Sequence, residues 1–211
     1  MIIKGLNKRL LETVALFFVI FFPRNVPEFF PMEEIGYTFL WRIPALILIL
    51  LLLESPPVFR PKRDILVLAA ALPTLMATGY IVSLAATLTG FYPPEEIMPP
   101  GNSLGWIAVI FLSFSIGALE EAFFRVYLPE RILGILAQKN GKTNRTIATA
   151  FIGAALVFSL CHVHEGPWGV TNAFLASAVL SIAYIKSASF PGIALAHGLY
   201  NIFVFLSAAH K

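Results

Sequence analysis

The segment LGWIAVIFLSFSIGALEEAFFR, residues 104–125, is the most informative part of the sequence, because an apolar run leads directly into a group of charged side chains. The uncharged part, 104–119, approaches the roughly 20 residues that a membrane-spanning helix needs. Glu120, Glu121 and Arg125 follow within the same apolar segment. Ionisable side chains cost free energy inside a bilayer, so this arrangement predicts a functional site in a transmembrane helix.

The whole chain has the composition of an integral membrane protein. It has 211 residues, of which 58% are hydrophobic and 13% charged, and a mean hydropathy of +0.80. Soluble domains carry about 25% charged residues. We therefore predict an all-α, polytopic transmembrane helix bundle with about seven spans (six to eight), forming a single domain over 1–211. The uncharged or nearly uncharged runs are 14–22, 35–53, 65–88, 104–119, 146–160, 168–185 and 190–207.

The basic residues lie in every second loop, which predicts the orientation of the chain. The net charge of +3 and the pI of 9.1 do not indicate nucleic acid, because the basic side chains flank membrane spans. By the positive-inside rule the N-terminus is cytoplasmic. The basic groups are Lys4, Lys8 and Arg9; Arg60, Lys62 and Arg63; Arg131, Lys139, Lys142 and Arg145; and Lys186.

The first polar cluster combines an ion pair with a second carboxylate. Glu121 and Arg125 are four residues apart on one helix face, in the order that favours an ion pair. Glu120 is rotated by about 100° from Glu121 and is predicted to remain free as a general base. A purely structural charge network of all three is the competing interpretation.

Two further clusters repeat the spacing of one helical turn. Phe158 and His162 share a face, as do His197 and Asn201 in a span with no other ionisable group. An imidazole and a carboxamide on one face are able to donate hydrogen bonds to a developing oxyanion. Taken singly, His162 is also typical of a structural residue at a helix end, and Asn201 of a hydrogen bond between helices.

The three clusters in order, E-E-x-x-x-R, F-x-x-x-H and H-x-x-x-N, resemble the CPBP family of CAAX proteases and bacteriocin-processing enzymes, which includes type II CAAX prenyl endopeptidases. The similarity covers about 104–207, and every motif position is filled. The resemblance implies an intramembrane glutamic endopeptidase that forms no covalent intermediate. By the same resemblance, Glu120 would activate a water, His162 would help to hold it, and His197 and Asn201 would form the oxyanion site. Glu121, Arg125 and Phe158 would support them.

Two other functions remain open from the sequence. Two histidines and a glutamate are enough ligands for a zinc-dependent intramembrane protease, although the His-Glu-x-x-His pattern is missing, so we expect no cofactor. A non-catalytic membrane scaffold for binding or immunity would use the same polar residues for a peptide tail. The expected partners are the lipid bilayer and a peptide or lipidated protein substrate, whose identity the sequence does not reveal.

The motifs meet only if the fourth helix is unusually long. Glu120 lies about 12 Å from Leu128, whereas His162 lies about 25 Å from Thr146, at 1.5 Å per residue. An extended or kinked fourth helix that continues to about Gln138 removes this mismatch. We also expect a stiff, proline-rich connection over 93–101, and close packing at small residues of the sixth span. These small residues are Ala173, Ala176, Ser177, Ala178 and Ser181.

Overall fold

The computed structural model is an all-helical bundle, and it describes residues 2–21, 38–90 and 103–208. No strand occurs among these residues, which confirms the predicted fold class. The predicted proline-rich connection over 93–101 lies outside them. The α-helices are α1 (Ile2–Phe21), α3 (Ile43–Leu52), α4 (Pro61–Thr89), α5 (Ser103–Glu121), α6 (Leu128–Asn140), α7 (Asn144–Leu160), α8 (Gly166–Ser187) and α9 (Phe190–Ala208). Short helical segments are η2 (Thr38–Arg42), η3 (Ala122–Tyr127) and η4 (Val163–Glu165).

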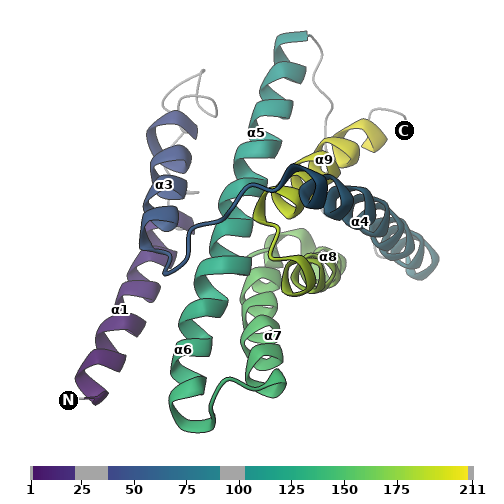
Figure 1. Cartoon of the computed structure of the whole chain (residues 1–211). Coiled ribbons are helices and arrows are strands. Elements are labelled where there is room, and N and C mark those ends of the chain that lie inside the picture. The colour runs from purple at the N-terminus through teal and green to yellow at the C-terminus, as the bar shows by residue number, and fades with distance from the viewer. Residues whose placement is uncertain (1, 22–37, 91–102, 209–211) are drawn as a thin grey trace.

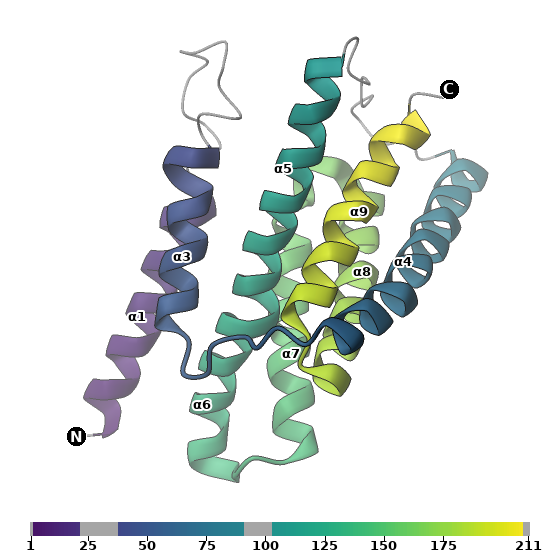
Figure 2. The same cartoon turned by 45° about the horizontal axis from the view of Figure 1, so that its top comes forward.

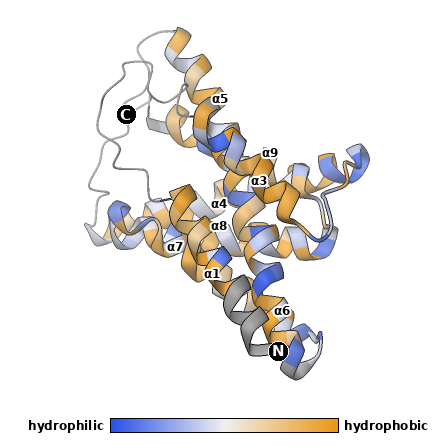
Figure 3. Cartoon of the chain, turned by 90° about the vertical axis from the view of Figure 1, so that its left-hand side faces the viewer, coloured by the Kyte–Doolittle hydropathy of each residue, from blue (hydrophilic) through white to orange (hydrophobic). Residues whose placement is uncertain are grey.

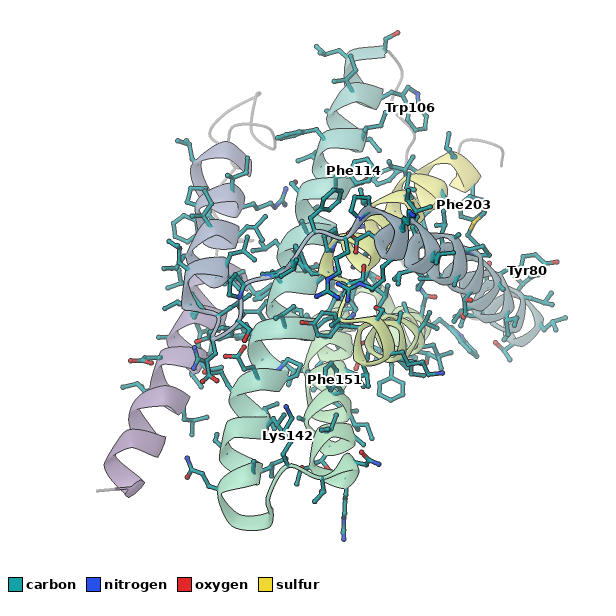
Figure 4. All side chains as sticks on the ribbon, viewed as in Figure 1. Tyr80, Trp106, Phe114, Lys142, Phe151 and Phe203 are labelled. Atoms are coloured by element: carbon teal, nitrogen blue, oxygen red, sulfur yellow. The ribbon has the colours of Figure 1, made fainter. Side chains whose placement is uncertain are left out.

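The helices have the length and surface of membrane spans. Within the described residues, four helices are long and apolar enough to cross a membrane, and three shorter apolar helices accompany them. Most of the helix ribbon is hydrophobic (Figure 3), and many large hydrophobic side chains are exposed, among them Leu51, Leu66, Leu88 and Leu160. Tyr80, for example, is 70% exposed and points away from the bundle on α4 (Figure 4). The chain is an integral membrane protein, because lipid is the solvent that favours such a surface.

The predicted extension of the fourth helix is confirmed. α5, η3 and α6 form one continuous helical rod, and its segment Ser103–Gln138, 36 residues long, contains a stretch apolar enough to cross a membrane. At 1.5 Å per residue this segment is about 54 Å long, well beyond the roughly 30 Å of a bilayer core. Its middle part, η3, is a π-helix in which the Leu128 N–H bonds the Phe123 carbonyl. Such wide turns are rare and often lie at functional sites.

The long rod divides the bundle into two sides. α1 and α3 lie on one side of α5 and α6, and α4, α7, α8 and α9 lie on the other (Figures 1 and 2). α9 packs between α5 and α4, and α7 packs between α6 and α8. Four of the predicted small residues of α8 are buried, namely Ala173, Ala176, Ser177 and Ser181, whereas Ala178 is half-buried. α8 contacts both α4 and α7, as close packing at small residues predicts.

Candidate active site

Aromatic side chains pack around the π-helix η3 and fix the position of the first motif, Glu120, Glu121 and Arg125. All six residues of η3 are buried. The rings of Phe123 and Phe124 lie 5.4 and 5.1 Å from Phe21 of α1, and Phe124 lies 5.0 Å from Phe158 of α7. Aromatic pairs at these separations stabilise a core beyond the area that they bury. The motif is therefore fixed between the two sides of the bundle.

Arg125 forms the predicted ion pair with Glu121. Its Nε lies 3.2 Å from Glu121 Oε2, and both side chains are completely buried. The guanidinium also lies 4.8 Å from the centre of the Phe158 ring, a cation–π contact. A buried cation needs such partners, because each buried charge loses its hydration.

His197 completes this group from α9. Its Nδ1 lies 2.8 Å from Glu121 Oε1, so Glu121 binds Arg125 with one oxygen and His197 with the other. His197 Nε2 faces Glu120 Oε2 at 3.6 Å. The prediction that Glu120 stays free of partners is therefore wrong, because α9 brings a histidine between the two carboxylates.

Two glycines explain how α9 comes so close to α5. A Cβ added at Gly117 would lie 3.0 Å from the Gly198 nitrogen, and one added at Gly198 would lie 2.5 Å from Phe114 Cδ1. Phe114 belongs to α5 and lies near its contact with α9 (Figure 4). Only glycine permits this approach of the two backbones, and Gly198 directly follows His197.

The adjacent glutamates have different environments. The Glu121 side chain is 0% exposed, whereas the Glu120 side chain is 18% exposed. The Glu120 carboxylate therefore reaches the surface of the bundle, whereas the Glu121 carboxylate does not. Helix periodicity points the two side chains in different directions. The structure shows that the buried one, Glu121, contacts both His197 and Arg125.

The second motif places His162 against the same phenyl ring. Its imidazole centre lies 4.6 Å from Phe158, and that of His197 lies 6.2 Å from Phe158 on α7. The His162 Nδ1 lies 2.9 Å from the Phe158 carbonyl oxygen. Because a carbonyl only accepts, Nδ1 carries the proton, and Nε2 of a neutral ring keeps its lone pair. His162 is half-buried, just after the end of α7.

Asn201 lies one turn beyond His197 and is half-buried. Among the described residues, no hydrogen bond to its side chain is found. The amide group is thus available on the helix that carries His197. His164 and Glu165 are paired at 3.6 Å on an exposed turn and lie outside this group.

The structure thus gathers residues of all three motifs at the junction of α5, η3, α7 and α9. Among the residues it describes, no group of three or more His, Cys, Asp or Glu side chains is placed to hold a metal ion. The expectation that the site acts without a metal stays a prediction.

Sequence reasoning missed one buried polar pair. Asp64, in the first turn of α4, is 3% exposed, and its carboxylate accepts a hydrogen bond from the fully buried Ser189 hydroxyl. A signal existed, since Asp64 is the only aspartate in the chain and stands at the start of an apolar helix. Its partner, however, is 125 positions away.

Comparison with known families agrees with the motifs. Residues 102–203 match the family model described as "Type II CAAX prenyl endopeptidase Rce1-like". No curated protein and no solved structure matches the chain. The matched segment begins at the start of α5 and ends within α9, and it contains every motif residue.

Proposed function

Since residues 102–203 belong to the Rce1-like family of type II CAAX prenyl endopeptidases, a protease family, we propose that this chain is an intramembrane glutamic endopeptidase. The observation that supports this most directly is the contrast between the two adjacent glutamates. Glu120 is partly exposed beside His197, whereas Glu121 is sealed between His197 and Arg125. One carboxylate is thus accessible from outside the protein, as a general base must be, while the other orients its neighbours.

Glu120 acts as the general base in this proposal. Its carboxylate takes a proton from a water molecule, whose oxygen attacks the carbonyl carbon of the scissile peptide bond. His162 accepts a hydrogen bond from the same water through Nε2, because its Nδ1–H is held by the Phe158 carbonyl. Glu120 then passes its proton to the leaving amine, so no covalent intermediate forms.

His197 and Asn201 bind the oxyanion of the tetrahedral intermediate. Glu121 holds His197 through Nδ1 and leaves Nε2 directed toward the Glu120 side. With both ring nitrogens protonated, His197, Arg125 and the two glutamates together carry no net charge. Donors fixed in this way stabilise the transition state without reorganisation. The substrate is a membrane-associated protein or peptide, which reaches Glu120 within the bilayer.

Glu120→Gln tests this proposal. The amide keeps the size of the side chain but does not accept the proton of water, so the cleavage rate is expected to fall by at least about 10²-fold. The measurement uses purified protein in lipid nanodiscs, candidate lipidated and unlipidated peptides, and mass spectrometry of the products. Glu12→Gln, an exposed carboxylate on α1, is the matched control.

Cleavage at the wild-type rate by Glu120→Gln would remove Glu120 from the mechanism. Inhibition by a chelator that added zinc reverses would indicate a zinc enzyme, whereas unchanged activity supports catalysis without a metal. Wild-type protein that binds peptides without cleaving them would identify a binding scaffold.

A further inference from the structure

Hydrogen bonds, one of them fully buried, connect the corner between α8 and α9 to the start of α4. Ser189 is 0% exposed, and its hydroxyl donates to Asp64 Oδ1. The other oxygen of this carboxylate accepts the Arg60 N–H at 2.7 Å, at the N-terminus of α4. Arg63 Nη2 donates to the Ala188 carbonyl at 3.2 Å. The carboxylate of Asp64 therefore joins the beginnings of α4 and α9.

Ser189 is also the N-cap of α9. The Gly192 N–H donates to its hydroxyl oxygen at 3.2 Å, in the pattern of a serine cap. Ala188, just before it, has the positive φ of 48°, which is uncommon for a residue other than glycine. The turn is thus set by its partners on α4 and not by local preference alone.

Close contact of the backbones leaves α9 little freedom at this corner. A Cβ added at Gly192 would lie 2.6 Å from the Ser189 hydroxyl and 2.8 Å from the Asp64 carbonyl oxygen. The first turn of α9 therefore rests directly on the first turn of α4. Packed helices do not deform continuously, so a change here moves α9 as a unit.

We propose that Asp64 and Ser189 are positioning residues for His197, because their bond fixes the start, and therefore the depth and rotation, of α9. The inference rests on the proposed function of His197 as an oxyanion donor. His197 lies about 12 Å along the helix from Ser189. Its ring must reach Glu121 at 2.8 Å and Glu120 at 3.6 Å simultaneously. The Asp64–Ser189 bond and the contact at Gly198 hold α9 on either side of His197.

Ser189→Ala is the test, measured first by kinetics. Loss of the hydroxyl removes the bond that fixes the start of α9. We expect kcat to fall about 10-fold or more and KM to change little, because a displacement of a catalytic group by about 1 Å lowers the rate by up to about 10²-fold. Ser189→Thr keeps the hydroxyl and is expected to restore kcat. Asp64→Ala should reproduce the defect, and the double variant should be no worse than either single one, because the pair acts as a unit. Ser207→Ala, which removes a hydroxyl bonded to Phe203 on the same helix, is the matched control.

A second measurement does not require activity. The chain has four histidines, so the ¹⁵N signals of His197 are assignable in nanodiscs with His→Gln variants. The Nδ1 signal, which reports the bond to Glu121, is expected to shift in Ser189→Ala but not in Ser207→Ala. If Ser189→Ala does not fold, Asp64→Asn, which keeps the side-chain volume, undergoes both measurements.

An unchanged kcat in Ser189→Ala, a failure of Ser189→Thr to restore it, or an unchanged His197 spectrum overturns the inference. If the wild-type protein cleaves nothing, the proposed function fails. The His197 spectrum then still decides whether Asp64 and Ser189 position this ring.

Discussion

At the scale of single residues, Glu120 and Glu121 show how neighbours of one type acquire separate tasks. Glu121 balances a buried arginine and orients a buried histidine, so its charge belongs to the folded structure. The Glu120 side chain remains 18% exposed beside His197. A buried charge left without its partner is expensive, whereas a partly exposed one is not.

The same substitution at the two positions should therefore have different effects. Glu121→Gln leaves Arg125 without its counter-charge and is expected to lower the free energy of unfolding by about 3–5 kcal/mol. Glu120→Gln should leave stability nearly unchanged while it lowers the cleavage rate by at least about 10²-fold. Thermal unfolding in a mild detergent, followed by circular dichroism, compares the two variants. Equal melting temperatures would contradict the assignment of Glu121 as the structural carboxylate.

At the scale of elements, the contact between α5 and α9 brings the first and third motifs together. His197 reaches Glu121 only because Gly117 and Gly198 let the two helices approach. Rings from α1 on one side of the rod and from α7 on the other pack against η3. The site therefore depends on two packed surfaces of one long helix.

Gly198→Ala tests this contact. The added methyl group would overlap Phe114, so α9 must move away from α5 and His197 away from Glu121. We expect a loss of about 1–3 kcal/mol of stability, as in other overpacked cores, together with a clear fall in kcat. Gly153→Ala on α7 is the control, because its new Cβ would meet Ile132 Cδ1 at an ordinary 3.6 Å. Equal behaviour of the two variants in both measurements would refute the argument.

At the scale of the whole molecule, the depth of the site follows from unequal helix lengths. The α6–α7 hairpin extends past the α8–α9 corner (Figure 2). Glu121 lies about 26 Å from Gln138, whereas His197 lies only about 12 Å from Ser189. The site therefore lies nearer, along α9, to the α8–α9 corner than it lies, along the rod, to the end of the α6–α7 hairpin.

This arrangement, with the positive-inside rule, predicts that the hairpin is cytoplasmic. Lys142 is exposed at the α6–α7 turn (Figure 4). In a Cys161→Ser background, Lys142→Cys is expected to react with a membrane-impermeant maleimide only from the cytoplasmic side. Ser207→Cys, near the other end of α9, should react from the opposite side. The reverse labelling pattern would show that the N-terminus is not cytoplasmic.

Much of the candidate site was predictable because it follows helix periodicity. The Glu121–Arg125 pair and the stacking of Phe158 on His162 arise between residues four apart, and the structure contains both. The long fourth helix followed from requiring Glu120 and His162 to lie at one depth. The π-turn of η3 was not predictable, because it depends on the packing of Phe123 and Phe124 against other helices.

The membrane-embedded helical bundle and its polar residues can be predicted from the sequence, since apolar length and spacing along one helix are local properties. The orientation of His197 by Glu121, the approach of His197 to Glu120 and the bond between Asp64 and Ser189 become visible only in the folded structure. These contacts join residues far apart in the chain. They exist because glycines and small buried side chains let separate helices approach, and helix periodicity carries no information about which helices will meet.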